Sequence, residues 1–231
     1  MAGSTDAASS HGGRRPWPAR LDALQSLTGL ALAAFLGVHL LLDSAILIGP
    51  DAADAVAKFF EGEPFLGSGQ PWIVSVAALG LLAMIALHGA LALRKFPHDY
   101  RQYRAFRGHL AAFPHSDTRL WWWQVVTGFL LFFLAAPHLY TVITQPEAIG
   151  AVPSSLRVAR EHAWVLYALF LPVVIIHAAA GTYRVVMKWR PPRRTGRIWL
   201  RRIMWVVALV YLSIGAAALV AYVRHGLALG A

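Results

Sequence analysis

Long stretches without a charged residue dominate the pattern of this chain. Five such runs each hold 20 or more residues, and they span residues 23–42, 64–93, 120–146, 162–183 and 203–223. About 20 apolar residues in a helix are enough to cross the hydrocarbon core of a bilayer. The pattern therefore predicts an all-α integral membrane protein with five transmembrane helices.

The segments around these runs complete the predicted organisation. Residues 1–20 are polar and lack the apolar core of a cleavable signal peptide, so we expect a disordered cytoplasmic tail. Residues 21–226 are expected to form the membrane domain, and residues 227–231 a short tail on the outer side. The start of the second run, residues 64–71, contains glycine and proline breakers and is expected to belong to the preceding loop.

Composition and charge support a membrane protein over a nucleic-acid-binding protein. The chain is 58% hydrophobic and only 14% charged, yet its formal net charge is +10. A soluble nucleic-acid-binding protein would spread charge over much of its surface, whereas this chain leaves long stretches bare. We therefore expect no nucleic-acid partner and a lipid bilayer as the main environment.

The distribution of Lys and Arg predicts the orientation of the chain. Seventeen of the 21 cations fall in segments that five alternating spans would bring to one side of the membrane. By the positive-inside rule, the N-terminus is cytoplasmic and the C-terminus lies on the outer side. The segment from Lys95 to Arg119 is expected to be a basic cytoplasmic loop. It could serve orientation and headgroup contact, or it could dock a soluble partner.

Cysteine is absent, which excludes disulfides and thiolate-held iron–sulfur clusters in this chain. Histidine is the remaining candidate ligand. One histidine lies deep in each of the first four runs, past the middle of the run. Because successive helices alternate in direction, these four sort into two levels, His39 with His138 and His88 with His177.

Two facing histidine pairs change the interpretation of each single residue. One membrane histidine by itself is more often an interhelical hydrogen-bonding group than a ligand. Two imidazoles that face each other across a four-helix core are what a bis-histidine haem needs. A non-haem metal site would want nearby carboxylates, and only Asp43 qualifies. We therefore expect the first four helices to form a haem-binding bundle.

The first and third runs repeat the same order of polar residues. Gln, Thr, Gly and His follow at equal spacing from Gln25 to His39 and from Gln124 to His138. At these offsets the Gln, Thr and His of each run lie on nearly the same helix face. Each Gln is about 21 Å along the helix from the His of its own run, which places it at the depth of His88 and His177. There the amides could bond haem propionates. Arg184 and Lys188 could neutralise the propionates, or could be ordinary positive flanking residues.

Several multi-residue motifs carry a family resemblance from about Pro18 to Gly226. They are Leu21–Gly29, His88–Pro97 with Tyr100–Tyr103, Trp121–Tyr140, Thr144–Pro146 and His177–Arg184. On these motifs the chain resembles the cytochrome b subunit of succinate:quinone oxidoreductases. The similarity is to the five-helix, single-subunit, dihaem type of menaquinol:fumarate reductases.

The resemblance implies roles for particular residues. His88 and His177 would ligate the iron of the proximal haem, and His39 and His138 that of the distal haem, both haems being of b type. The residues around the proximal propionates would be Gln25, Ser26, Trp121 and Lys188. Glu61, in the segment Lys58–Glu61, would be the acid of the menaquinone/menaquinol site and its proton acceptor.

The resemblance also implies partners. FAD and iron–sulfur clusters would be held only by a flavoprotein subunit and an iron–sulfur subunit of the same complex, in the bacterial cytoplasmic (inner) membrane, and a dimer of heterotrimers is compatible with it. This chain would not handle the dicarboxylate itself. One departure is Ile175, where some family members carry a Glu that is proposed to pass protons, so we expect that compensating proton route to be absent.

Two other functions compete with this interpretation. Dihaem cytochrome b anchors of hydrogenases, formate dehydrogenases or nitrate reductases also place paired histidines on membrane helices, but the motifs above disfavour them. A His-lined proton or metal transporter would need acids or broken helices within the spans and an inverted repeat. The apolar runs show no clear sign of these features.

Overall fold

Five long helices make up most of the computed structural model, which describes residues 17–96, 99–112 and 116–229. They are α1 (Trp17–Asp43), α4 (Pro71–Leu93), α6 (Ser116–Thr144), α8 (Ala163–Trp189) and α9 (Arg194–Ala228). All five are long and apolar enough to cross a membrane, with peak mean hydropathy between 1.8 and 2.4. The prediction of an all-α, multi-pass membrane protein is confirmed.

The outward-facing side chains fit a lipid environment. Large apolar residues on the long helices are exposed, with Phe129 62%, Phe133 64% and Leu209 64% accessible. In water such a surface would be unfavourable, whereas lipid tails cover it at little cost.

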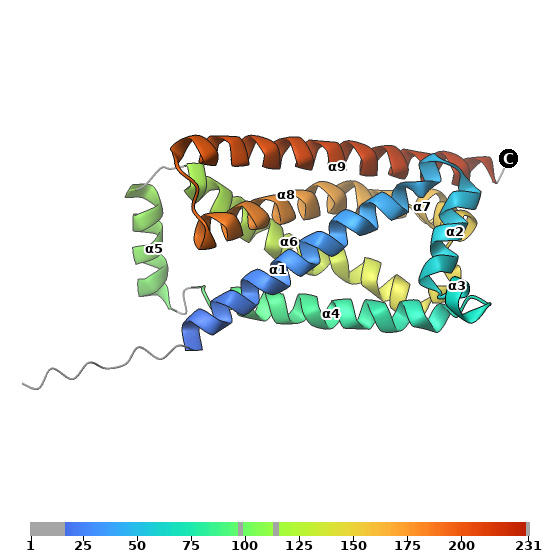
Figure 1. The fold of residues 1–231 in the computed structure, drawn as a ribbon, viewed down its shortest axis with the longest axis horizontal. Coiled ribbons are helices and arrows are strands. Elements are labelled where there is room, and N and C mark those ends of the chain that lie inside the picture. The colour runs from blue at the N-terminus through green and yellow to red at the C-terminus, as the bar shows by residue number, and fades with distance from the viewer. Residues whose placement is uncertain (1–16, 97–98, 113–115, 230–231) are drawn as a thin grey trace, which may run out of the picture.

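The first four long helices form a closed bundle. Within it α1 contacts α4, α4 contacts α6, α6 contacts α8, and α8 returns to α1. The fifth, α9, packs along α8 on the outside of this ring, and it is the long red helix at the top of Figure 1. The arrangement agrees with the predicted four-helix bundle plus one flanking span.

Short helices lie at the two ends of the bundle (Figure 1). At one end, α5 (Tyr100–Ala112) runs across the bundle axis; we call this the α5 end. At the other end lie α2 (Pro50–Phe60), α3 (Glu63–Leu66) and α7 (Ala151–Arg160); we call this the α7 end. Two 3₁₀ turns, η1 (Ser44–Leu47) and η2 (Pro146–Ala148), lead into α2 and α7.

Small residues allow the helices at the α7 end to approach closely. Ala151 of α7 is fully buried in a cluster with Ile46, Ala53 and Ala218. Where α9 crosses α7, a Cβ on Gly226 would overlap the backbone carbonyl of Ser155. Close backbone approach at small residues is the usual way in which membrane helices gain packing energy.

The structure differs from the predicted organisation in three places. First, α1 already begins at Trp17, inside the stretch expected to be a tail, while residues 1–16 lie outside the described residues. Second, the expected basic loop contains α5, whose mixture of Arg and Tyr has no long apolar run to reveal it. Third, α9 continues to Ala228, beyond the predicted end of the domain. Most of the segment predicted as a loop before the second span does lie outside that span, because α4 starts at Pro71, but part of it forms the short helix α3.

Candidate functional site

The four deep histidines project from the four helices of the bundle. His39 on α1 and His138 on α6 face each other, with ring centroids 6.2 Å apart and ring planes at 52°. His88 on α4 and His177 on α8 each lie against a glycine of a neighbouring helix, Gly29 of α1 and Gly128 of α6. All four side chains are half-buried. The structure therefore brings His39 and His138 face to face, as the alternation of the helices predicts, and it points His88 and His177 at the neighbouring helices of the same bundle.

The spacing of the His39 and His138 rings fits a metal ion held between them. A bond from a transition metal to an imidazole nitrogen is about 2 Å long, so two such bonds plus the ring radii need roughly 6 Å between centroids. The geometry of this pair suits bis-histidine ligation.

Room for the other pair is made by two glycines. A Cβ on Gly29 of α1 would lie 2.8 Å from Cε1 of His88, and one on Gly128 of α6 would lie 2.9 Å from Cε1 of His177. The preceding residues, Thr28 and Thr127, are buried with 9% and 3% exposure. Their hydroxyls lie 3.1 and 3.2 Å from Nδ1 of His88 and His177, respectively. The repeated Thr-Gly motif thus acts on the neighbouring helix, holding its histidine in place.

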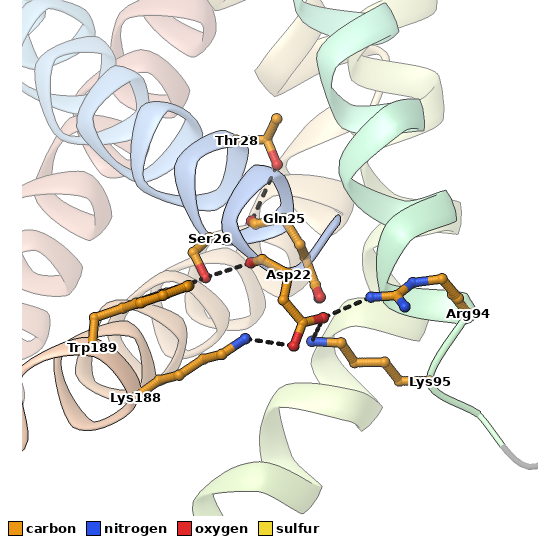
Figure 2. A network of polar contacts seen from close by, with 8 residues as sticks. All are labelled: Asp22, Gln25, Ser26, Thr28, Arg94, Lys95, Lys188 and Trp189. Atoms are coloured by element: carbon orange, nitrogen blue, oxygen red, sulfur yellow. Dashed lines mark hydrogen bonds and ion pairs between the residues drawn. The ribbon is translucent and has the colours of Figure 1, made fainter. Parts of the chain in front are cut away.

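A cluster of cations at the α5 end surrounds one carboxylate, as Figure 2 shows. The oxygens of Asp22 lie 2.6 Å from a nitrogen of Arg94, 3.2 Å from Nζ of Lys95 and 2.8 Å from Nζ of Lys188. Partial burial lowers the pKa of Lys95 from its ordinary value, and the Asp22 carboxylate opposes this. Three cations against one acid leave an excess of two positive charges, which matches the two carboxylates of a haem.

The other predicted propionate residues lie near this cluster or beside α8. Ser26 donates to the Asp22 carbonyl (2.9 Å) and accepts from the indole nitrogen of Trp189 (3.0 Å). Arg184 donates to the side-chain oxygen of Gln124, the repeat counterpart of Gln25. Trp121 is half-buried, and its ring centroid lies 6.5 Å from that of Trp122.

Gln25 has an unsatisfied polar atom. Its side-chain oxygen is buried and has no hydrogen-bond partner among the described residues. Buried polar groups are nearly always paired, so an orphaned amide indicates a group that the chain itself does not supply. A half-turn of this amide would present its NH2 group, a hydrogen-bond donor, to a carboxylate. Together with the two glycine cradles and the excess positive charge, the amide of Gln25 fits a carboxylate-bearing ligand of the size of haem.

Aromatic side chains surround the pair at the α7 end. Phe35 stacks on His39 with centroids 5.4 Å apart and nearly parallel planes. Around His138, the Tyr167 hydroxyl lies 3.3 Å from Nδ1 and the Phe170 ring centroid lies 5.7 Å from that of the imidazole. The flat rings leave the pair in a largely apolar setting.

An open hollow of about 440 Å³ lies at the same end, and Glu61 is part of its wall. Its other lining residues are Asp51, Asp54, Ala55, Ala57, Lys58 and Ile149. Glu61 is half-buried at the end of α2 and its side chain lies against Gly69, so closely that a Cβ there would overlap the carboxylate. The hollow therefore combines three carboxylates, one cation and three apolar residues.

Sequence reasoning missed several of these contacts. Asp22 and Arg94 lie in the quoted motifs, but nothing in their spacing places them together, because they are 72 residues apart. Trp189 and Tyr167 look like ordinary interfacial aromatics in the sequence. The Thr-Gly repeat can be seen in the sequence, but only the packing of neighbouring helices shows that it contacts His88 and His177.

The fold and the site define an integral membrane protein whose four-helix bundle carries paired histidines at two levels. The chain belongs to the family of succinate dehydrogenase/fumarate reductase transmembrane subunits, which it matches over residues 100–216. The family resemblance predicted from the motifs is confirmed.

Individual relatives agree with this family. The chain is 44% identical to the fumarate reductase cytochrome b subunit of Helicobacter pylori over 209 residues, which cover 90% of this chain and 82% of the relative. It is 40% identical to the fumarate reductase cytochrome b subunit of Wolinella succinogenes over 215 residues, which cover 91% and 84%. Membership of this family favours a fumarate reductase cytochrome b subunit over the anchor of another respiratory enzyme and over a transporter.

Proposed function

We propose that this chain is the cytochrome b membrane anchor of a quinol:fumarate reductase or succinate:quinone oxidoreductase. It would carry electrons between menaquinone and an iron–sulfur subunit by means of two bis-histidine b haems. The observation that carries the proposal is the presence of two histidine pairs at two levels of one bundle, with the His39 and His138 rings 6.2 Å apart. The names of the relatives support it.

The chain's own residues would hold each haem in a different way. His39 and His138 would ligate one iron, and His88 and His177 the other. Bound in such sites, a b haem supplies reversible one-electron oxidation and reduction of its iron. At the α5 end Arg94, Lys95 and Lys188 would neutralise propionates, because a carboxylate in a low-dielectric setting needs nearby positive charge. The Gln25 amide, whose NH2 group can donate to a propionate, would complete that polar rim with Ser26, Trp121 and Arg184.

Glu61 would be the proton acceptor of the quinone site. Oxidation of a quinol to a quinone releases two electrons and two protons, so an ionised carboxylate next to the quinol hydroxyl can take up one proton as the O–H bond breaks. In the hollow beside Glu61, Ala55, Ala57 and Ile149 could contact the quinone ring, and Lys58 could contact a ring oxygen. This end of the bundle also carries the His39–His138 pair, which keeps donor and acceptor near each other.

The cations of the α5 end also support a proposal for the orientation of the chain in the membrane and for its partners. The α5 end, with its Arg and Lys residues, would face the cytoplasm and dock the iron–sulfur subunit, which would exchange electrons with the flavoprotein subunit in the bacterial inner membrane. Those subunits would supply the iron–sulfur clusters and FAD, since this chain has no cysteine to hold a cluster.

Ile175 is buried at 5% exposure and offers no carboxylate on α8. Proton release at the α7 end would then lack a compensating return route along this helix.

The decisive test is the haem content of the complex purified from membranes. We expect a reduced b-type spectrum with two haems per chain, and a His138→Ala variant should retain one. His162→Asn is the matched control, because His162 is exposed and caps α8 in a left-handed conformation that Asn tolerates. A colourless wild-type complex, or a His138→Ala variant with two haems, would contradict the proposal.

A further inference from the structure

The hydroxyls of Thr28 and Thr127 each have a hydrogen-bond acceptor within their own helix. Oγ1 of Thr28 lies 2.9 Å from the Leu24 carbonyl, and Oγ1 of Thr127 lies 2.6 Å from the Trp123 carbonyl. A hydroxyl carries one hydrogen, and in a helix interior it commonly donates to the carbonyl four residues earlier. The hydrogen of each hydroxyl is therefore directed at the backbone, and its lone pairs are free.

The histidine next to each hydroxyl must then be the donor. Nδ1 of His88 lies 3.1 Å from Oγ1 of Thr28, and Nδ1 of His177 lies 3.2 Å from Oγ1 of Thr127. An oxygen that has already donated its hydrogen can only accept, so Nδ1 of each ring carries a proton. In a neutral imidazole the lone pair then resides on Nε2, the nitrogen that a metal needs.

A backbone carbonyl supports the same assignment at His177. Nδ1 of His177 lies 3.1 Å from the Gln124 carbonyl oxygen, which cannot donate. Nδ1 of His177 thus faces two acceptors from one turn of the neighbouring helix, while Nδ1 of His88 faces the hydroxyl of Thr28. The glycine that follows each threonine leaves the space that the ring occupies.

We infer that Thr28 and Thr127 are positioning residues that fix the Nδ1-protonated tautomer of His88 and His177 and present both Nε2 atoms to one haem iron. This inference rests on the proposed function. A hydrogen bond from Nδ1–H makes the imidazole a more basic ligand, which favours ferric over ferrous iron. Two threonines 99 residues apart therefore tune the same haem, while the haem of the His39–His138 pair lies outside their reach.

The test is a redox titration of the purified complex with Thr28→Val and Thr127→Val, followed by optical and ferric EPR spectra. Valine keeps the size and branching of threonine and removes the oxygen. Each variant should raise the midpoint potential of the same haem and leave the other unchanged. A tenfold loss of ferric preference corresponds to about 59 mV for a one-electron couple. Loss of the haem of the His88–His177 pair in a valine variant, with that haem retained in the corresponding serine variant, would also support the inference.

Two sets of controls separate the hydroxyl from the packing. Thr28→Ser and Thr127→Ser keep the oxygen and should restore the wild-type potential. Thr144→Val removes a hydroxyl that also bonds the carbonyl four residues earlier on α6 but is exposed, and it should change neither haem. The inference is overturned if haem-loaded Thr127→Val keeps both wild-type potentials, or if serine fails as valine does. A wild-type complex without haem would overturn the proposed function instead.

Discussion

At the α5 end of the bundle the histidine rings are held by hydroxyls and carbonyls of neighbouring helices, whereas at the α7 end they pack against aromatic rings. His177 has both the Thr127 hydroxyl and the Gln124 carbonyl at Nδ1. His138 has one phenol at 3.3 Å, and His39 stacks on Phe35. The same residue type is thus supported by directional polar contacts at one end and mainly by packing at the other.

The surroundings of the two pairs differ in charge as well. The α5 end carries an excess of cations around Asp22, while the hollow at the α7 end is lined by the carboxylates of Asp51, Asp54 and Glu61 and by one cation, Lys58. Excess positive charge stabilises the anionic edge of a cofactor, and carboxylates exchange protons with a substrate. Under the proposed function, the α5 end would serve anchoring and partner docking, and the α7 end would serve quinone chemistry.

The largest expected effect belongs to Glu61 and is confined to the α7 end. Glu61→Gln removes the proposed proton acceptor while keeping the shape of the side chain, so quinol-dependent fumarate reduction should fall about 10²–10⁴-fold. Fumarate reduction with an artificial donor that bypasses the quinone site should stay at the wild-type rate. Both rates are measured on the same purified complex.

The matched control for this change is Glu63→Gln. Glu63 lies two residues after Glu61, at the start of α3, and pairs with Lys58 at 3.8 Å, and Glu63 is not among the residues that line the hollow. Its quinol activity should stay within about twofold of wild type, as expected for loss of an exposed ion pair. Equal rates for Glu61→Gln and wild type would remove Glu61 from the quinone site and weaken the division between the two ends.

An intermediate effect is expected from Gly128→Ala at the α5 end. The new Cβ would lie 2.9 Å from Cε1 of His177, so the ring or α6 must shift. Overpacking of this kind costs about 1–3 kcal/mol. We expect a lower thermal midpoint and a perturbed EPR signal of one haem only.

Gly80→Ala provides the reference for Gly128→Ala. Gly80 is also in the middle of a spanning helix, and a Cβ there would have open space within 4 Å. This variant should keep both haem signals, and its stability should equal or exceed that of wild type, since Ala favours helix more than Gly does. If both alanine variants behave alike, the close approach at Gly128 has no role in holding His177.

The smallest expected effect is that of Asp22→Asn. The carboxylate is 31% exposed and contacts three cations, and exposed ion pairs contribute about 1 kcal/mol or less. Its loss should lower the thermal midpoint slightly and raise the potential of the α5-end haem, because a negative charge near that haem disappears. Redox titration distinguishes the two haems, and a shift confined to the other haem would contradict the placement of this cluster.

Several features could be predicted from the sequence because they depend on local composition. Five uncharged runs of 20 or more residues are enough to fix the number of spans, and alternation of direction is enough to pair His39 with His138. By contrast, α5 is short and rich in Arg, and α2 and α7 are short amphipathic helices, so no long apolar run marks them. The roles of Glu61 and of the histidines as ligands stay predictions.

The sequence by itself determined that this chain spans a membrane, that its helices alternate and that its histidines lie at two depths. These properties follow from hydropathy and helix periodicity, which act within one segment at a time. Only the tertiary structure decided that Thr28 contacts His88, that Thr127 contacts His177 and that Asp22 gathers cations from α8 and from the end of α4. Such contacts depend on the rotation and closeness of neighbouring helices, which small residues and packing set across the bundle and not along the chain.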